Sequence, residues 1–280
     1  MDKKLIDLFI KNAIAEDLGD GDHTSLSTIP AGARGKAKLL VKEAGILAGV
    51  ELAMEIFNQI DATLQTEIFI NDGETVAYGD VAFTVEGSTH AILLAERLVL
   101  NCMQRMSGIA TKTNRIVKSL ESYTTKLLDT RKTTPGLRYI EKWAVRIGGG
   151  VNHRIGLYDM ILIKDNHVDY AGGIANAITA ANQYLADQAK QLEIEIEVRN
   201  LEELNQVLEK GMVSRIMLDN FSFDDLNTAV KLIDHRYITE ASGGITEENI
   251  TQYADCGVDY ISMGAITHSV KSLDMSLKAY

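Results

Sequence analysis

Short apolar runs and amphipathic stretches alternate along the second half of the chain. Between the later runs, three stretches have the apolar spacing of helices and acidic residues near their start, at 201–211, 221–234 and 246–257. The last four runs begin 21 to 23 residues apart, the length of a strand followed by a short helix. This repeat predicts a parallel α/β barrel, and an open doubly wound sheet is the alternative. The predicted strands are 126–131, 160–166, 194–200, 215–220, 237–244 and 260–265.

The first hundred residues have a different pattern. An amphipathic helix at the start is followed by short strand-like runs that glycines separate, at 37–49, 66–70, 74–79 and 81–87. A long helical stretch then covers 87–120. This order predicts an α+β domain with short antiparallel strands ahead of the barrel.

Composition is that of a globular chain with an ordinary buried core. The 280 residues, 46% of them hydrophobic, suffice for one large or two moderate domains. Cys102 and Cys256 match no metal-ligand or redox spacing, which indicates a reducing compartment. The opening helix carries Asp7, Lys11 and Glu16, unlike a signal peptide, and no uncharged run approaches the ~20 residues that span a bilayer. We therefore predict a cytoplasmic protein without a membrane partner.

Charge is unevenly distributed within this acidic chain of net charge −11. Residues 97–167 contain 13 Lys and Arg against 5 Asp and Glu. A basic segment inside an acidic protein indicates a local anion site, whereas a nucleic-acid-binding protein more often has a basic domain. For Lys112, Arg115 and Lys118, spaced three apart, a solvated helix face is the simpler interpretation.

Charged residues and glycines follow the predicted strands, at the edge where parallel α/β folds bind ligands. Glu197 and Asp219 end adjacent strands, and their oxygens suit Mg²⁺ held together with substrate oxygens. A structural salt bridge to Lys164 or Arg131 is the alternative. Glu195 shares a strand face with Glu197, so either could be the inward carboxylate.

Two glycine-containing loops and one basic loop complete the pattern. Residues 240–246 and 262–269 place small residues between a strand end and a helical stretch, where backbone N–H groups can approach a phosphate. The loop at 148–154 has three glycines and then His153 and Arg154, a pair suited to a carboxylate. The ligand predicted from these residue types has several negative charges at one end, a metal near its middle and a phosphate at the other end.

Seven segments of the chain resemble the motifs of one family. The segments "DTRKTTPGLRYIEKWAVRIGGGVNHRIGLYDMILIKDNH", "AERLVLNCMQRMSGIAT", "IEIEV", "IMLDN", "EASGGI" and "GVDYISMGAITHS" resemble those of quinolinate phosphoribosyltransferase, also called nicotinate-nucleotide pyrophosphorylase. "EDLGDGDHTS" at 16–25 is similar to its N-terminal signature, so the resemblance covers essentially the whole chain. It implies phosphoribosyl transfer from phosphoribosyl pyrophosphate to quinolinate, with Mg²⁺, giving nicotinate mononucleotide, CO₂ and pyrophosphate in NAD synthesis.

The resemblance also implies an architecture and an assembly. The expected fold is an N-terminal α/β sandwich domain, residues 1–105, joined to an incomplete, roughly seven-stranded α/β barrel, residues 106–267. The C-terminal tail, about 268–280, is expected to pack back on the sandwich. A homodimer with a shared active site is implied, with a hexamer as the larger assembly.

Roles for individual residues follow from their positions in the family motifs. The quinolinate carboxylates are expected to contact Arg131, His153, Arg154 and Lys164. Arg97 is expected to reach the site across the dimer interface. The phosphoribosyl pyrophosphate is expected to face the catalytic residues Lys132, Glu197 and Asp219, the last two also as metal ligands. Its 5′-phosphate is expected to contact Ser242, Gly243, Gly244, Gly264 and His268.

Three other interpretations fit the sequence less well. A related molybdenum-associated family differs around the second basic cluster, whereas this chain keeps "GGGVNHR" and "LIKDNH". A nicotinate phosphoribosyltransferase, acting on a monocarboxylate, would need fewer cations. A non-catalytic phosphate-binding module has no reason to collect both cations and carboxylates in one pocket.

Overall fold

A computed structural model describes residues 3–280, which group into two compact units. Within the described residues, unit 1 comprises 3–115, Thr133–Gly149 and Ile266–Tyr280, and unit 2 comprises Ile116–Lys132 and Gly150–Ala265. These limits differ from the predicted domains, because residues 106–115, 133–149 and 266–267, expected in the barrel, group with unit 1. The long helix α4 (Thr89–Ser119) continues across the predicted boundary at residue 105.

Unit 1 is built on a four-stranded sheet in the order β12-β1-β5-β3, with every neighbouring pair antiparallel. Its strands are β1 (Arg34–Val41), β3 (Gln65–Ile68), β5 (Val81–Ser88) and β12 (Met275–Ala279). A small second sheet pairs β2 (Gly45–Ile46) with β4 (Thr75–Val76). Ahead of residue 266, the helices that belong to this unit are α1 (Lys3–Leu18), α2 (His23–Thr28), α3 (Val50–Ile60), α5 (Arg138–Ile147) and most of α4.

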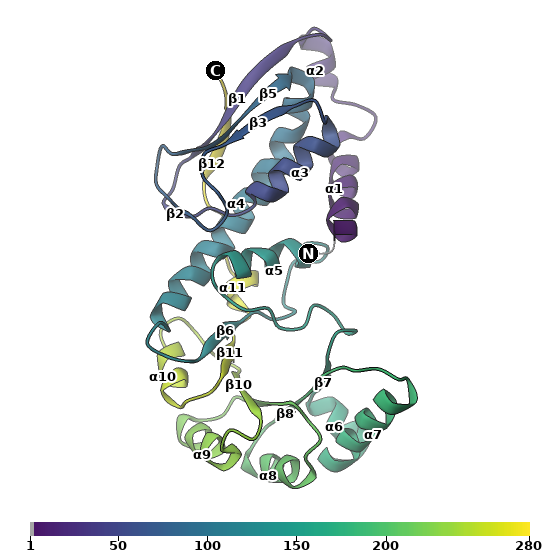
Figure 1. Cartoon of the computed structure of the whole chain (residues 1–280), viewed down its shortest axis with the longest axis vertical. Helices are drawn as coiled ribbons and strands as arrows, with labels where there is room; N and C mark the ends of the chain where they lie inside the picture. Colours follow the sequence, from purple (N-terminus) through teal and green to yellow (C-terminus); the bar gives the residue numbers. More distant parts are fainter. Residues whose placement is uncertain (1–2) are drawn as a thin grey trace. The chain divides into compact units, whose positions relative to one another are not determined.

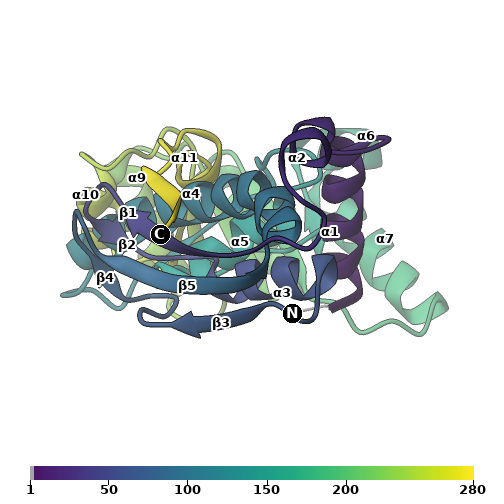
Figure 2. The same ribbon diagram turned by 90° about the horizontal axis from the view of Figure 1, so that it is seen from above.

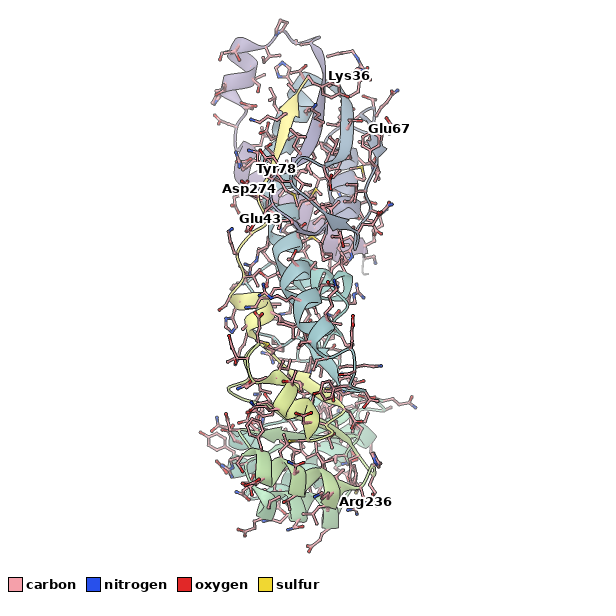
Figure 3. The ribbon with its side chains drawn as sticks, turned by 90° about the vertical axis from the view of Figure 1, so that its left-hand side faces the viewer. Lys36, Glu43, Glu67, Tyr78, Arg236 and Asp274 are labelled. Carbon is pink, nitrogen blue, oxygen red and sulfur yellow. The ribbon has the colours of Figure 1, made fainter. Side chains whose placement is uncertain are left out.

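Alternation along β1 gives this sheet one buried and one exposed face. Ala37, Leu39 and Val41 are buried, and helices α3 and α4 lie on their side of the sheet (Figures 1 and 2). Phe57 of α3 meets Phe83 of β5 edge to face, with ring centroids 5.8 Å apart. The other face carries polar side chains, among them Lys36 and Glu67, which Figure 3 labels.

Unit 2 contains six parallel strands in the order β6-β11-β10-β9-β8-β7. Its strands are β6 (Lys126–Leu128), β7 (Ile161–Ile163), β8 (Ile194–Val198), β9 (Arg215–Asp219), β10 (Ile238–Ser242) and β11 (Tyr260–Ser262). Strands β7 to β11 are neighbours in chain order and β6 pairs with the last of them, which is the order of a barrel and excludes a doubly wound sheet. Val151 adds a single parallel bridge to Leu128. In the described residues the ring is not closed between this bridge and β7, so the predicted incomplete barrel is confirmed, with six strands where roughly seven were expected.

The helices of unit 2 are α6 (Asp165–Ala171), α7 (Ile174–Asp187), α8 (Leu201–Lys210), α9 (Phe223–Ile233) and α10 (Ile250–Asp255), and the short α11 (Ala265–His268) begins at its last residue. Helix α8 begins at the Asn200 cap and ends at Gly211, as its sequence predicts. Arg236, labelled in Figure 3, donates to the carbonyl oxygens of the last turn of α9.

The helix predicted at 246–257 is present, but its predicted first residue is wrong. Thr246 N–H donates to the Asn249 side chain (2.8 Å), which closes a turn where the first helical turn was expected. Helix α10 therefore begins only at Ile250, and the two glutamates of this stretch precede it.

The pairing of β12 with β1 generates a test of stability. Leu277→Ala removes a buried side chain from β12, so we expect the free energy of unfolding to fall by about 2–5 kcal/mol. Lys278→Ala, at the exposed next position, should change it by no more than about 0.5 kcal/mol. Urea denaturation followed by circular dichroism measures both variants, and equal effects would contradict the packing of β12 described above.

Candidate active site

A cavity of about 640 Å³ opens at the carboxyl ends of the parallel strands of unit 2. Ten residues singled out from the sequence line it, namely Arg131, Lys132, His153, Arg154, Lys164, Glu197, Asp219, Ser242, Gly243 and Gly244. Six further lining residues were not predicted, namely Thr130, Leu162, Met217, Asn220, Glu240 and Ser262. All sixteen belong to unit 2, so this unit contains a cavity with cations, carboxylates and a glycine loop.

The cationic side chains come from the loops that follow β6, β7 and the Val151 bridge. Burial lowers the pKa of Arg154, and the charge of Arg131 lowers it further. Lys164 follows β7 directly, where its backbone N–H donates to Nδ1 of His167 in α6 (2.9 Å). Because Arg154 and Arg131 repel each other, an anion between them would relieve the repulsion and bind favourably.

The two predicted metal-side carboxylates line the middle of the cavity. Lys164 Nζ lies 3.3 Å from Glu197 Oε2, so the alternative of a salt bridge is present in this structure. Burial raises the pKa of Glu197, Lys164 opposes the rise, and the charge of Asp219 adds to it. The two carboxylates thus repel each other electrostatically, and their oxygens fit a hard cation such as Mg²⁺.

The glycine loop after β10 has a backbone that favours glycine. Gly243 and Gly244 have φ of +92° and +62°. A Cβ on Gly243 would overlap the carboxamide of Asn220. Asn220, at φ +55°, donates from its side chain to Asp219 Oδ2 (2.6 Å) and from its backbone to the Ser242 carbonyl (2.9 Å). Asn220 therefore links one cavity carboxylate to the glycine loop.

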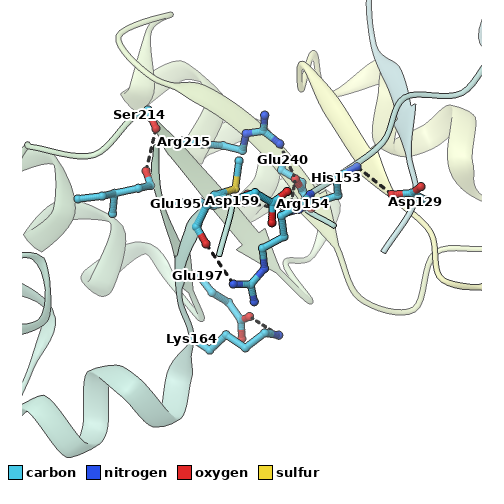
Figure 4. A network of polar contacts seen from close by, with 12 residues as sticks. Asp129, His153, Arg154, Asp159, Lys164, Glu195, Glu197, Ser214, Arg215 and Glu240 are labelled. Carbon is cyan, nitrogen blue, oxygen red and sulfur yellow. Dashed lines mark hydrogen bonds and ion pairs between the residues drawn. The ribbon is translucent and has the colours of Figure 1, made fainter. Parts of the chain in front are cut away.

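Beneath the cavity lies a buried cluster of charged groups (Figure 4). His153 Nε2 is 2.9 Å from Glu195 Oε2 and 3.4 Å from Glu240 Oε2. Arg215 Nη1 is 3.2 Å from Glu240 Oε2, and its guanidinium lies over the Tyr260 ring, 4.8 Å from the centroid. The sequence left open which glutamate of β8 faces the site. Glu195 is fully buried in this cluster, whereas Glu197 lines the cavity.

Protons in this cluster are distributed by burial and by hydrogen-bond direction. Burial, and next the charge of Glu240, raise the pKa of Glu195 to about 7. At His153, burial disfavours a charged ring, but the two glutamates outweigh it and raise the pKa. The Arg154 N–H, however, donates to Nδ1 (2.7 Å), so a second ring proton there would face another donor. We therefore place the ring proton on Nε2, between the glutamates.

Comparison with known proteins identifies the family. The chain matches the family "Quinolinate phosphoribosyl transferase, N-terminal domain" over residues 22–107 and "Quinolinate phosphoribosyl transferase, C-terminal domain" over residues 109–278. The chain belongs to the quinolinate phosphoribosyltransferase family. This confirms the resemblance drawn from the motifs, and with it the predicted class of enzyme, a decarboxylating pentosyltransferase.

Relatives and solved structures of this family match most of the chain. A tobacco (Nicotiana tabacum) quinolinate phosphoribosyltransferase [decarboxylating] is 48% identical, over 96% of this chain and 81% of its own length. The nicotinate-nucleotide pyrophosphorylase [carboxylating] of Arabidopsis thaliana is 47% identical, over 96% and 81%. The solved structure of the nicotinate-nucleotide pyrophosphorylase from Francisella tularensis is 41% identical, with a TM-score of 0.92 over 100% of this chain and 98% of that one.

Three predicted site residues of this family member lie outside the residues that line the cavity. Gly264 belongs to unit 2 but is not part of the lining, and Arg97 and His268 belong to unit 1, where both are exposed. The loop at 240–246 also lacks the expected helix directly behind it, because α10 begins only at Ile250.

Some of the missed residues had a signal in the sequence. Glu240 is an acid within a predicted strand and shares a strand face with Ser242, which was predicted. Asn220 follows Asp219 at a strand end, where asparagine tolerates positive φ. Leu162 and Met217 had no such signal, because apolar residues are expected on any buried strand.

The two glycines of the loop provide a matched pair of variants. Alanine at either position meets a positive φ, which costs about 1–2 kcal/mol. Gly243→Ala adds the overlap with Asn220, whereas the Cβ of Gly244→Ala meets open space. We expect Gly243→Ala to lower the free energy of unfolding by about 1–3 kcal/mol more than Gly244→Ala does. Thermal and urea denaturation measure the difference, and equal losses would show that the Asn220 contact is not tight.

Proposed function

We propose that the chain transfers the phosphoribosyl group of phosphoribosyl pyrophosphate to quinolinate and releases pyrophosphate and CO₂, giving nicotinate mononucleotide for NAD synthesis. The observation that carries the proposal is that several cations, two carboxylates and a glycine loop line one cavity. A dicarboxylate and a phosphorylated sugar donor that carries a metal ion together need these three kinds of group.

The quinolinate carboxylates are assigned to Arg131, Arg154 and Lys164, beside His153. Guanidinium groups bind carboxylates through two parallel hydrogen bonds. The pKa of Arg154 is lowered by burial and by Arg131, and a bound carboxylate would offset both effects. Arg97 is assigned to the site of a partner subunit, which makes the active form a homodimer, with a hexamer as the larger assembly to be tested.

The phosphoribosyl pyrophosphate is assigned to the remaining cavity. Lys132 faces the pyrophosphate, and Glu197 and Asp219 would hold Mg²⁺ together with oxygens of the donor. When bound, Mg²⁺ would neutralise charge on the leaving pyrophosphate. The amides of the loop after β10 suit a 5′-phosphate because they lack bulky side chains. The phosphate residues assigned are Ser242, Gly243, Gly244, Gly264 and His268.

The chemistry proposed for these residues is orientation and charge placement. Departure of pyrophosphate leaves positive charge on the anomeric carbon, which Glu197 and Asp219 would stabilise while the pyridine nitrogen attacks. As CO₂ leaves, the electron pair of the breaking C–C bond stays on the ring carbon beside the ribosylated nitrogen, whose positive charge stabilises it. A proton from solvent then adds to this carbon and gives nicotinate mononucleotide. No covalent nucleophile is required. Burial raises the pKa of Cys102 to about 12, which makes it a poor nucleophile.

Location is a separate proposal. Among residues 3–280, every helix is too short or too polar to cross a membrane. We propose the cytoplasm, which suits two free buried thiols, although relatives from tobacco and rice are named mitochondrial and chloroplastic.

Pyrophosphate release tests the reaction. With phosphoribosyl pyrophosphate and Mg²⁺, we expect release with quinolinate but not with nicotinate. Arg131→Ala should lower kcat/KM for quinolinate at least about 30-fold, because a charged partner of the carboxylate is lost. Lys190→Ala, an exposed lysine of the same unit, is the matched control. Release with nicotinate alone would refute the substrate, and no release with either would favour a phosphate-binding module.

Subunit exchange tests the role of Arg97. Arg97→Ala and Arg131→Ala should each be nearly inactive alone. Mixed dimers should recover part of the activity, because one of their two sites then contains both native arginines. Verified heterodimers that remain inactive would contradict a shared site.

A further inference from the structure

The interior of this barrel is charged where barrels are usually filled by branched apolar side chains. Glu195 and Glu240 are fully buried, and His153 and Arg215 are 7% and 9% exposed. The two glutamates come from β8 and β10, and Arg215 comes from β9 between them. Each buried ion costs several kcal/mol of desolvation, so apolar residues of similar volume would stabilise the fold equally well or better. The cluster therefore needs an explanation other than stability.

The contacts of His153 lead from this cluster to the cavity (Figure 4). Its backbone N–H donates to Asp129 Oδ1 (2.8 Å), and Asp129 Oδ2 accepts from the Asn152 side chain (2.6 Å). Its Nε2 lies 2.9 Å from Glu195 Oε2 and 3.4 Å from Glu240 Oε2, and its Nδ1 accepts the Arg154 N–H. The imidazole thus lies between two buried carboxylates and the main chain of a cavity-lining arginine.

We propose that Glu240, together with Glu195, is a positioning residue for the reaction: the two carboxylates hold His153 in one orientation and one tautomer, and His153 in turn fixes Arg154 at the quinolinate end of the cavity. The proposal rests on the proposed function for its substrate. The Arg154 side chain donates one long hydrogen bond, from Nη1 to the Met160 carbonyl (3.3 Å), so the main-chain hydrogen bond to His153 matters for its placement.

Direct contact between Glu240 and the substrate is the weaker explanation. Although Glu240 lines the cavity, its carboxylate is fully buried and faces Arg215 and His153. A negative charge presented to a dianionic substrate would weaken binding, whereas one presented to the far side of His153 orients the ring without meeting the substrate.

Kinetics of Glu240→Gln test the proposal, because the amide keeps the shape but removes the charged acceptor. We expect KM for quinolinate to rise about 10-fold or more, with a change below about 3-fold in KM for phosphoribosyl pyrophosphate. Glu202→Gln, an exposed change of the same kind in α8, is the control. If Glu240→Gln fails to fold, the same readout is taken from Glu195→Gln. An unchanged quinolinate KM in the folded variant would overturn the proposal.

A double-mutant cycle separates action through His153 from direct contact. His153→Gln removes the imidazole. In this background, Glu240→Gln should raise KM for quinolinate by less than about 2-fold, because the link to Arg154 is already lost. If the two substitutions raise KM for quinolinate by the product of their separate effects, Glu240 acts by another route and the proposal is overturned.

Nitrogen-15 NMR of the histidine rings gives a readout that does not depend on activity. The signal missing from His153→Gln identifies His153. We expect the Nε2–H tautomer in the native chain at neutral pH and a mixture of tautomers in Glu240→Gln. A freely titrating native ring would overturn the proposal, as would a stoichiometric metal ion that is bound by the native chain and lost from Glu240→Gln. Fixed tautomers without any reaction of quinolinate would instead refute the proposed function alone.

Discussion

Accommodation of two buried carboxylates is the constraint on which the active-site half of this chain depends. Glu195 and Glu240 lie inside the barrel with no exposure to solvent. Arg215 offsets the charge of Glu240, and Nε2 of His153 lies close to both acids. The strand register brings them together, because β9 carries Arg215 between the two strands that carry the acids. A shift of one residue in any of these strands would turn a charge toward the apolar helix layer.

The unclosed side of the barrel shapes the cavity. In place of a full strand between β6 and β7, Val151 makes one bridge, and the following residues form a loop that contains His153 and Arg154. Asp159 stabilises this loop by accepting the N–H groups of Ile155 (2.7 Å) and Gly156 (2.9 Å). A complete strand would bury alternate side chains against neighbours, whereas the loop presents consecutive basic residues to one cavity.

The sequence predicted the strands of unit 2 well because they are short, rich in apolar residues and regularly spaced. It predicted most cavity-lining residues because charges at the ends of parallel strands must meet. It could not assign residues 133–149 to unit 1, since a turn such as "TTPG" sets a change of direction but not its destination. Nor could it find the partners of His153, because strand parity gives Glu195 and Glu197 the same face and only their depth in the barrel separates them.

The strand pairing of unit 1 has a consequence for synthesis. Ala37 pairs with Ala279, so β1 lies in a sheet whose edge strand is translated last among the described elements. The contacts of β12 can form only after the whole of unit 2 has left the ribosome. Until then β1 is an unpaired edge strand of the sheet that it forms with β5 and β3. This unpaired edge is therefore open to pairing with other chains until β12 has been made.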